Sequence, residues 1–452
     1  MRILFFIAPR RKKLSFGERF FTKMGGSATP FLAPSFLSAY VKKYSKKNFE
    51  IKFIDARNAD IGIGDCLKEI EKFDPDFIGI SSFTCGIKDA YIFASKIKKI
   101  SDIPILMGGP HTTFMPKEAL QYCDIVVRGE GEKTFRQLIE AFPWSNKKLK
   151  KINGISYKSN KKIVHNPPQK FIEPLDKIPF PDWDICPKSY PIHKGFGYVL
   201  TSRGCPFRCT FCVSSKTLGK PWRAYSSTRV LAELEWLVEK YSAKQILFLD
   251  ENFCLNKKRV MEICKGIVDR KLDIVFACDA RVNAVDEEML MAMKKAGCQT
   301  IYFGVESGYQ KILDLYKKGI TISQIKRAFR LCNKVGIPTA AGWIIHPSYN
   351  EKDFLHDLMF AFKLNAGAIT LSQLIPFPGT GIYNELKNNK KPISQDWDLY
   401  GGSDVLVNGT LSKRKRKFWQ LFFMLVYHLS PFAAIQRPRI FLEIWKTVFK
   451  MI

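Results

Sequence analysis

The sequence contains no apolar run long enough to cross a membrane and no internal repeat or low-complexity tract. The late run FWQLFFMLV falls well short of the roughly 20 residues that a spanning helix needs. The opening MRILFFIAP has only six apolar residues after its arginine, too few for the core of a secretory signal peptide, so we expect a cytoplasmic protein. Without repeats, solenoid and fibrous architectures are excluded, and 46% hydrophobic with 25% charged residues indicates a folded globular chain.

Acidic residues are scarce relative to basic ones, because 42 Asp and Glu stand against 72 Lys and Arg, for a net charge of +30. This balance favours an anionic partner such as nucleic acid, a phosphorylated substrate or an anionic membrane surface, and selects none of them. The lysines are spread through nearly every expected helix, as in KIKKISD, which indicates solvated helix faces more than a focused patch. We therefore do not expect a nucleic-acid-binding protein.

Short β-prone runs alternate with amphipathic stretches over residues 1–145. The runs RILFFIA, FEIKFID, DFIGISS, IPILMGG and DIVVRGE predict five strands, and FLAPSFLSAYVKKY together with 62–73, 86–100 and 131–141 predicts helices. This alternation is typical of an α/β fold with a parallel sheet covered by helices. The first domain is therefore predicted to be doubly wound, with ligands at the carboxyl ends of its strands.

A proline-rich segment, 146–194, interrupts the alternation and is predicted to be a linker, with a small hairpin at GISYKSNKKIVHN. Over 195–400 six further strand–helix units predict a partial (β/α)6 barrel, with its chemistry at the strand carboxyl ends. The predicted barrel strands lie near 197–202, 245–250, 273–278, 299–304, 337–345 and 368–375. The predicted barrel helices include 227–242, 256–270, 285–295, 322–335 and 351–364.

Residues 401–452 are predicted to form a helical extension. The segment KRKRKFWQLFFMLVYHLSPFAAI reads as a basic amphipathic helix. Two placements stay open for it, packed as a cap on the barrel or lying on a membrane surface.

The first barrel strand leads into TSRGCPFRCTFC, which gives the spacing C-x3-C-x2-C for Cys205, Cys209 and Cys212. In a reducing compartment metal ligation is favoured over disulfides. Three thiolates from one loop can bind three irons of a [4Fe–4S] cluster and leave the fourth iron open to an exchangeable ligand. Zinc is the structural alternative, but tetrahedral zinc needs a fourth ligand, and no second cysteine or histidine pair follows nearby.

The other cysteines stand singly, mostly in apolar stretches, and are interpreted as buried, inert thiols. Examples are Cys85, Cys264, Cys278 and Cys332.

The cysteine motif, placed after the first barrel strand, resembles the radical S-adenosylmethionine (SAM) superfamily over roughly residues 195–400. The resemblance implies that SAM chelates the open iron, and that its reductive cleavage, fed by an electron donor such as flavodoxin or ferredoxin, gives a 5′-deoxyadenosyl radical. Polar groups at the ends of the next strands fit the positions that hold SAM in this superfamily, although each carboxylate alone could equally be a surface or capping residue. These groups are Asp250 and Glu251 in ILFLDENF, Asp279 and Arg281 in ACDARVN, and Glu306 and Ser307 in IYFGVESG.

Two glycine-containing segments of the first domain, ILMGGPHTTF and DIVVRGEGEKTF, follow predicted strands. Such glycines let a backbone approach a ligand closely, although tight strand-to-helix turns alone would explain them. In this order, ahead of the barrel, G-G-P-H and G-E-G-E resemble the cobalamin-binding radical SAM family, as does PLDKIPFPDWDI of the linker. The resemblance implies a corrinoid on the carboxyl edge of the first sheet, next to the barrel mouth. The contacts that it implies are Ser81, Ser82, Gly108, Gly109, Pro110, His111, Gly129 and Glu130.

The chain departs from related motifs in two places. The motif D-x-H-x-x-G is absent and Arg57 stands where its histidine would fall, so cobalamin is expected to bind without that axial ligand or not at all. The fifth barrel strand reads AGWIIHPSYNE where relatives often carry a glycine-proline-glycine turn, and His346 there either reaches the active site or is a structural histidine.

The family resemblance implies C-methylation of an unactivated carbon, in which the adenosyl radical abstracts hydrogen and methylcobalamin supplies the methyl group. Two alternatives stay open, namely radical cyclisation, rearrangement or oxidation without methyl transfer, and a non-catalytic iron–sulfur or corrinoid-binding protein. A methylthiotransferase is disfavoured because Cys66, Cys85 and Cys123 stand isolated. The basic, aromatic C-terminal region would suit a lipid or isoprenoid-like substrate presented at a membrane, and a soluble metabolite or peptide fits nearly as well.

Overall fold

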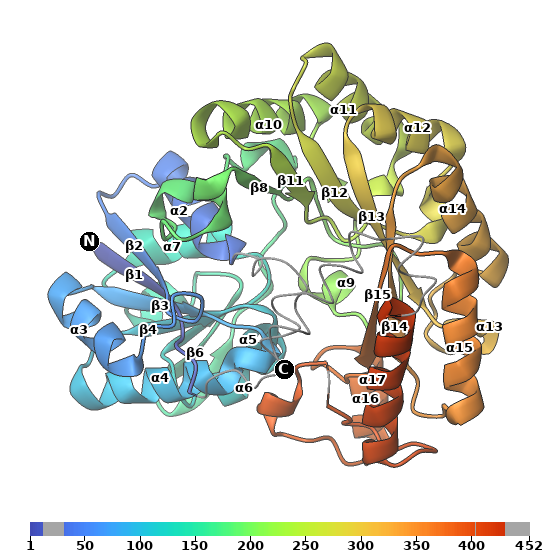
Figure 1. Cartoon of the computed structure of the whole chain (residues 1–452). Coiled ribbons are helices and arrows are strands. Elements are labelled where there is room, and N and C mark those ends of the chain that lie inside the picture. Colours follow the sequence, from blue (N-terminus) through green and yellow to red (C-terminus); the bar gives the residue numbers. More distant parts are fainter. Residues whose placement is uncertain (12–30, 403, 430–452) are drawn as a thin grey trace.

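The structure is a computed structural model that describes residues 1–11, 31–402 and 404–429. Two sheets, each with helices packed on it, lie side by side, the N-terminal one in blue and cyan and the second in green to orange (Figure 1). The predicted α/β class with two parallel sheets is therefore confirmed.

The first sheet has seven strands in the order β2-β1-β3-β4-β5-β6-β7. Strands β1 to β5 are parallel, as predicted, and β6 and β7 are antiparallel additions at one edge. The strands are β1 (Arg2–Ile7), β2 (Glu50–Asp55), β3 (Phe77–Ser81), β4 (Ile105–Gly108), β5 (Ile125–Val127), β6 (Ile155–Ser159) and β7 (Lys162–His165). The hairpin expected in the linker is thus β6–β7, and it extends this sheet beyond residue 145.

Helices cover both faces of the first sheet, which is why consecutive residues of β1, such as Leu4 and Phe5, are all buried. The helices are α2 (Leu32–Tyr44), α3 (Ile63–Phe73), α4 (Ile87–Ile100), α5 (Pro110–Phe114), α6 (Pro116–Ala119), α7 (Glu132–Ala141) and α8 (Asn146–Leu149). The strand order reverses between β1 and β3, the place at which open sheets of this type bind ligands.

The second sheet has six parallel strands in the order β15-β14-β13-β12-β11-β8, so it is a partial barrel that stays open between β8 and β15. Its strands are β8 (Phe196–Val199), β11 (Gln245–Phe248), β12 (Val275–Ala280), β13 (Cys298–Glu306), β14 (Thr339–Ile345) and β15 (Ala368–Gln373). Its helices are α9 (Ser214–Thr217), α10 (Ser227–Tyr241), α11 (Lys257–Asp269), α12 (Glu287–Lys295), α13 (Gln310–Leu315), α14 (Ile322–Val335) and α15 (Glu351–Leu364). Both the barrel and its predicted helix positions are confirmed.

The proline-rich segment between the sheets is packed against both of them. The Trp183 side chain is fully buried, and the Tyr190 hydroxyl donates to Asp55 of the first sheet at 2.5 Å. Asp182 accepts hydrogen bonds from Ser38 and Lys42 of α2. On the barrel side, Lys240 of α10 pairs with Asp184 of the segment at 2.6 Å, so the segment contacts both halves.

The C-terminal region continues with α16 (Gly381–Asn388) and α17 (Lys413–Leu429). Helix α17, red in Figure 1, lies against β15 and α15 of the barrel. Phe423 packs edge-on to Trp343, and the Tyr427 hydroxyl donates to the Ala366 carbonyl at 2.7 Å. The described part of the extension therefore forms a cap on the barrel, while 430–452 lie outside the described residues.

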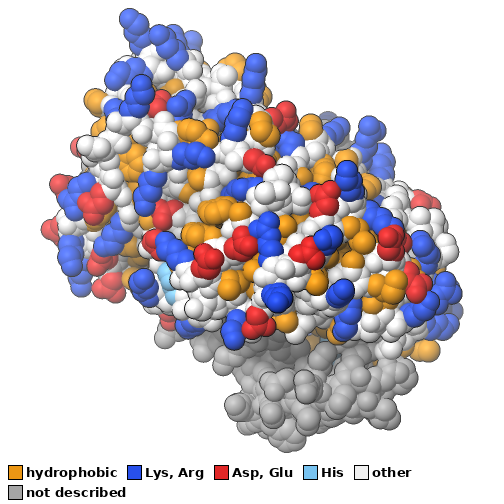
Figure 2. All heavy atoms as spheres, turned by 90° about the horizontal axis from the view of Figure 1, so that it is seen from above, with side chains coloured by type: hydrophobic (Ala, Val, Ile, Leu, Met, Phe, Trp, Pro, Cys, Tyr) orange, Lys and Arg blue, Asp and Glu red, His pale blue; other side chains and the backbone are white. Residues whose placement is uncertain are grey.

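Over the part of the chain that the structure describes, no helix is long and apolar enough to span a membrane. On the face shown in Figure 2, lysine and arginine side chains are dispersed among acidic and apolar ones. This dispersal fits the interpretation of the lysines as solvated helix faces.

Candidate functional site

A cavity of about 440 Å³ lies where the carboxyl ends of both sheets meet. One wall comes from the segments that follow β3, β4 and β5, and the opposite wall includes Leu200, Arg203 and Leu249 of the barrel half. Because both sheets bind ligands at their carboxyl ends, this is the place at which the two predicted cofactor sites come together.

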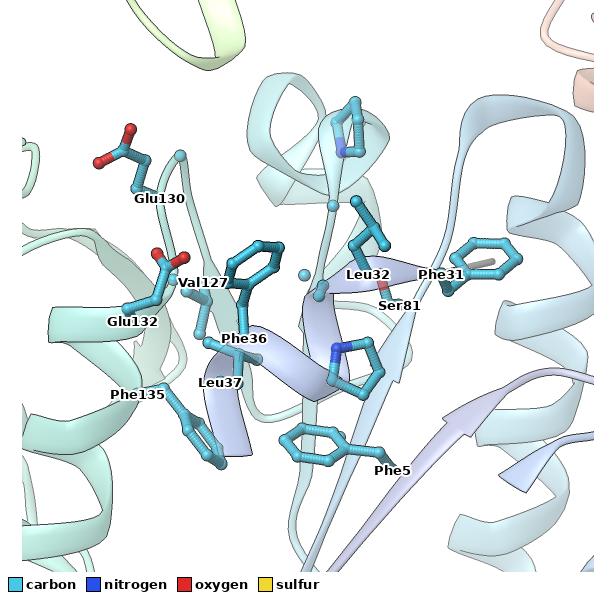
Figure 3. A pocket seen from close by; sticks show the side chains of 18 of the residues that line it. Phe5, Phe31, Leu32, Phe36, Leu37, Ser81, Val127, Glu130, Glu132 and Phe135 are labelled. Carbon is cyan, nitrogen blue, oxygen red and sulfur yellow. The ribbon is translucent and has the colours of Figure 1, made fainter. Parts of the chain in front are cut away.

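The interior of this cavity is apolar and aromatic, with Phe5, Phe36 and Phe135 among its lining residues (Figure 3). Two carboxylates, Glu130 and Glu132, lie together on one side of it. A mostly apolar cavity with few polar groups is the usual form of a cofactor site.

Glycines shape the rim of the cavity and test whether a corrinoid fits there. Gly109 has φ +110°, and a Cβ atom on it would lie 2.5 Å from the Ser82 carbonyl oxygen, so this position needs glycine for the backbone alone. Gly108 differs, because a Cβ there would meet no neighbouring atom closer than 3.9 Å. Bare backbone at Gly108 leaves room for a ligand to approach the strand end, and the residues present therefore fit a corrinoid.

Of the predicted cobalamin contacts, six line the cavity and two do not. Ser81, Gly108, Gly109, Pro110, Gly129 and Glu130 line it. Ser82 is buried, and its hydroxyl donates to the Phe83 carbonyl.

The buried imidazole of His111 also turns away from the cavity. Its Nδ1 lies 3.2 Å from the Thr84 hydroxyl, its Nε2 lies 3.5 Å from Glu118 Oε1, and its ring packs edge-on to Trp397. Trp397 donates to the same Glu118 carboxylate at 2.8 Å. His111 therefore connects the first domain to the segment between α16 and α17.

Arg57, which stands in the place of the missing histidine, pairs with Asp89 at 2.7 Å.

The three predicted cluster cysteines lie on one loop, 204–222, between two short antiparallel strands, β9 (Ser202–Arg203) and β10 (Arg223–Ala224). All three thiols are free and partly exposed. Among the described residues, no three His, Cys, Asp or Glu side chains converge on a single metal ion. In a cubane each thiolate binds a different iron, and three thiols on one loop can supply those three ligands.

Two of the predicted SAM residues brace this loop. Asp250 is fully buried and accepts hydrogen bonds from the Thr201 amide at 3.0 Å and the Thr201 hydroxyl at 2.8 Å. The Arg281 guanidinium stacks 3.6 Å from the Phe207 ring centroid, with Nη1 3.8 Å from the Cys209 sulfur. Asp250 therefore fixes the segment that leads into the cluster loop, and Arg281 contacts the loop itself.

Glu251 and Asp279 are open to the barrel mouth. Asp279 is exposed to solvent at the strand end, but the protein atoms around it in the mouth reduce its hydration, and this desolvation, together with the charges of Glu251 and Asp250, raises its pKa to about 7. Burial also raises the pKa of Glu251, against a hydrogen bond from Ser214 that lowers it. An acidic mouth of this kind suits a cationic ligand such as the sulfonium and ammonium groups of SAM.

Glu306 ends β13 with φ +65°, a strained conformation for a residue other than glycine, and strain of this kind clusters at functional sites. Its carboxylate pairs with the buried Lys318 ammonium at 2.5 Å, and Lys318 also lies over the ring of Phe211 in the cluster loop. Ser307 is fully buried and shares a 2.6 Å hydrogen bond with Tyr349, so it supports the strand end. Lys318 was not predicted, because it belongs to no motif.

A second cavity, of about 400 Å³, lies against the inner faces of β13, β14 and β15. Tyr302, Glu306, Thr370 and Ser372 line it together with Cys85 from the first domain. Cys85 is exposed, so its interpretation as a buried thiol is wrong, whereas the same interpretation is confirmed for the three other examples, which are buried.

His346 does not line this second cavity. Its Nδ1 hydrogen-bonds the Ser348 hydroxyl at 2.7 Å, and burial lowers its pKa. This favours the structural reading of His346.

Comparison with known proteins matches the same two halves. Residues 199–361 match the radical SAM superfamily and residues 30–139 match the B12 binding domain. An uncharacterised methyltransferase of Pyrococcus horikoshii is 36% identical over 437 residues, which cover 94% of this chain and 93% of that protein. The chain belongs to the cobalamin-binding radical SAM family.

Another relative is a cyclase and not a methyltransferase. An anaerobic magnesium-protoporphyrin IX monomethyl ester cyclase of Rubrivivax gelatinosus is 29% identical over 408 residues, covering 85% of this chain and 73% of the cyclase. A solved radical SAM methyltransferase from Kitasatospora setae, TsrM, with cobalamin and [4Fe–4S] cluster bound, shares the fold with TM-score 0.68 at 19% identity, covering 86% of this chain and 75% of TsrM. The predicted family, enzyme class and three cofactors, a [4Fe–4S] cluster, SAM and cobalamin, are confirmed.

Proposed function

We propose that this enzyme transfers a methyl group to an unactivated carbon of a small-molecule substrate. The cavity shared by the two sheets carries the proposal, because it brings the corrinoid-binding edge of the first sheet next to the cluster loop. When bound, the cluster and SAM supply a substrate radical and cobalamin supplies the methyl group. The protein orients these groups and excludes water from them.

The residues divide into those that contact cofactors and those that support them. Cys205, Cys209 and Cys212 would hold the cluster. Glu251, Asp279 and the Glu306–Lys318 pair would face SAM in the barrel mouth, while Asp250, Arg281 and Ser307 support the strand ends and the loop. Ser81, Gly108, Gly109, Pro110 and Gly129 would lie against cobalamin.

The test uses SAM labelled with deuterium in its methyl group, a low-potential reductant, and a small-molecule extract of the cells in which this protein occurs naturally. After anaerobic reconstitution with iron, sulfide and hydroxocobalamin, mass spectrometry should find a product that gains the labelled methyl group. It should also find 5′-deoxyadenosine and S-adenosylhomocysteine in comparable amounts. The Cys209→Ala variant is the control for cluster-dependent cleavage.

The other possible outcomes of this experiment would support one of the alternative functions. If a substrate is consumed and 5′-deoxyadenosine forms, but no product carries the labelled methyl group, the reaction is a cyclisation, rearrangement or oxidation. The cyclase relative is the reason to test for these reactions. A fully loaded protein that never cleaves SAM would be a binding protein. Flavodoxin or ferredoxin is the proposed physiological electron donor, and replacing the chemical reductant by either one should support turnover.

We place an anionic membrane surface against helix α17. Phe418, Leu421 and Leu425 form a ridge on its outward face, with exposed fractions of 60%, 52% and 40%. Lys413, Arg414, Lys415 and Lys417 precede or flank this ridge and are exposed. A basic helix with an apolar outer ridge is the form in which proteins contact anionic lipid.

Co-sedimentation tests this placement with vesicles of phosphatidylglycerol and phosphatidylcholine, against vesicles of phosphatidylcholine alone. Replacing the three ridge residues by serine should abolish binding to the anionic vesicles. Met291→Ser, which removes an equally exposed side chain (53%) from α12, should leave it unchanged. Equal binding by the ridge variant would refute the membrane contact and favour a freely diffusing enzyme.

A further inference from the structure

An arginine flanks the cluster loop on each side. Arg203 on β9 and Arg223 on β10 lie directly opposite one another in the antiparallel pair. Two like charges in opposite positions repel, so this pairing needs negative counter-charges close by.

Those counter-charges come from the other half of the molecule. Arg203 Nη2 lies 2.6 Å from Glu132 Oε1, and Arg203 Nη1 lies 3.8 Å from Glu130 Oε1. Arg223 reaches both oxygens of Glu130, with Nη2 at 2.5 Å and Nη1 at 3.2 Å. A two-oxygen arginine–carboxylate pair of this kind fixes orientation as well as distance.

All four side chains are withdrawn from solvent, with exposed fractions of 5–7%. Burial opposes ionisation of Glu132, but the charge and hydrogen bond of Arg203 outweigh it and hold the pKa of Glu132 below its ordinary value. A buried charge that loses its partner is strongly unfavourable, so each half of the molecule depends on the other here.

The same groups touch the loop and the cavity. Arg223 Nη2 also donates to the Leu218 carbonyl of the loop at 2.9 Å. Arg203 lies 5.4 Å from the ring centroid of Phe36, and both residues line the shared cavity. The four charges therefore lie between the two cofactor sites.

We infer that Glu130 and Glu132 are positioning residues that clamp both ends of the cluster loop to the cobalamin edge of the first sheet. The G-E-G-E segment thus holds the cluster loop through its carboxylates, while its glycines border the cavity. Both oxygens of Glu130, predicted from the sequence as a cobalamin contact, are occupied by Arg223.

The clamp couples the two sites, and this part rests on the proposed function. A corrinoid lying against 129–132 restricts that turn and, through the two arginines, the loop that carries the cysteines. Because such coupling is reciprocal in binding free energy, a bound corrinoid stabilises the ordered loop and an ordered loop strengthens corrinoid binding.

Hydrogen–deuterium exchange of peptides from 204–222 tests the clamp in the protein without cofactors. The Glu130→Gln/Glu132→Gln double variant should exchange in this loop at least about tenfold faster than wild type. The matched control is Glu233→Gln, which breaks a buried 2.8 Å pair with Arg229 on α10 and should leave the loop rate near wild type. If the double variant fails to fold, Glu132→Gln and its conservative partner Glu132→Asp replace it, with Glu132→Asp expected to restore slow exchange in part.

Hydroxocobalamin tests the coupling. It should slow exchange of the 204–222 peptides in wild type and lose that effect in the variant, and the electron paramagnetic resonance signal of the reduced, reconstituted cluster should change shape in the variant. An unchanged loop rate in the cofactor-free variant would overturn the clamp. Corrinoid binding by wild type without any change in loop exchange would overturn the coupling. A wild-type protein that binds no corrinoid would count against the proposed function. The exchange experiment on the cofactor-free protein would still decide whether the clamp exists.

Discussion

Substitutions at two neighbouring glycines separate the needs of the backbone from those of the cofactor. Gly108 is the last residue of β4, Gly109 follows it directly, and both line the shared cavity. A Cβ atom at Gly108 would meet no protein atom closer than 3.9 Å, whereas a Cβ atom at Gly109 would lie 2.5 Å from the Ser82 carbonyl oxygen in a backbone with φ +110°. We therefore expect opposite phenotypes from Gly108→Val and Gly109→Ala.

The magnitudes follow from these contacts. Gly109→Ala combines an unfavourable backbone conformation of about 1–3 kcal/mol with a steric overlap of about 1–3 kcal/mol, and should lower the free energy of unfolding by about 2–6 kcal/mol. Gly108→Val places its Cβ atom in ordinary van der Waals contact at the end of a strand, where β-branched residues are favoured, and should change the free energy of unfolding by less than about 0.5 kcal/mol. The valine methyl groups would stand where we place the corrinoid, and should weaken hydroxocobalamin binding at least about tenfold, equivalent to about 1.4 kcal/mol.

Urea unfolding of the cofactor-free protein, followed by tryptophan fluorescence, measures the first effect, and a visible-spectrum titration with hydroxocobalamin measures the second. Wild-type affinity in Gly108→Val would place the corrinoid elsewhere and refute this reasoning. Wild-type stability in Gly109→Ala would show that Gly109 does not have a positive φ next to the Ser82 carbonyl oxygen.

Three further predictions concern the cluster, the barrel mouth and the C-terminal helix. Replacing any one cluster cysteine by alanine should abolish the broad visible absorbance of the cluster and all SAM cleavage. Hydroxocobalamin should still bind to such a variant. SAM cleavage by the variant would show that these three cysteines are not the cluster ligands. Because the pKa of Asp279 is about 7 in the folded protein against an ordinary 3.8, the folded form holds the extra proton between about pH 4 and 7, so this group's contribution to stability falls as pH rises through that window. Asp279→Asn should therefore gain stability over wild type across the window, and urea midpoints with parallel pH profiles would contradict this. Phe423→Ala should lower the free energy of unfolding by about 3–5 kcal/mol, because Phe423 is buried against the barrel. Phe418→Ala, on the outward face of α17, should lower it by less than about 0.5 kcal/mol. Equal urea midpoints for the two variants would mean that α17 does not cap the barrel.

The sequence was informative wherever the signal is local. Helix α14 spans the predicted 322–335, because a capping box formed by Thr321 and Gln324 starts it and Gly336, in the left-handed conformation, ends it. The cysteine motif is equally local, since its ligands come from one loop. Strand ends were predicted for the same reason, and with them the edge at which the cofactors lie.

The direction in which a strand-end side chain points was less predictable. Asp250 and Ser307 lie at the predicted strand ends, but hydrogen bonds to Thr201 and Tyr349 turn them into the fold. His111 turns toward Glu118 for the same kind of reason.

Contacts between distant segments left no sequence signal. The pairs of Arg203 with Glu132 and of Arg223 with Glu130 join residues on different domains, and nothing in either segment alone specifies its partner. Lys318 has no sequence signal, and Cys85 was interpreted as buried, because only the folded chain brings Lys318 beside the cluster loop and Cys85 to the second cavity.

The most direct test of the account is the corrinoid content of the protein after anaerobic purification and reconstitution with iron, sulfide and hydroxocobalamin, read from its visible spectrum. The account predicts nearly one corrinoid per chain together with a full [4Fe–4S] cluster. A loaded cluster that cleaves SAM in a protein without corrinoid would contradict it, and would mean that the first domain has kept the fold without the cofactor.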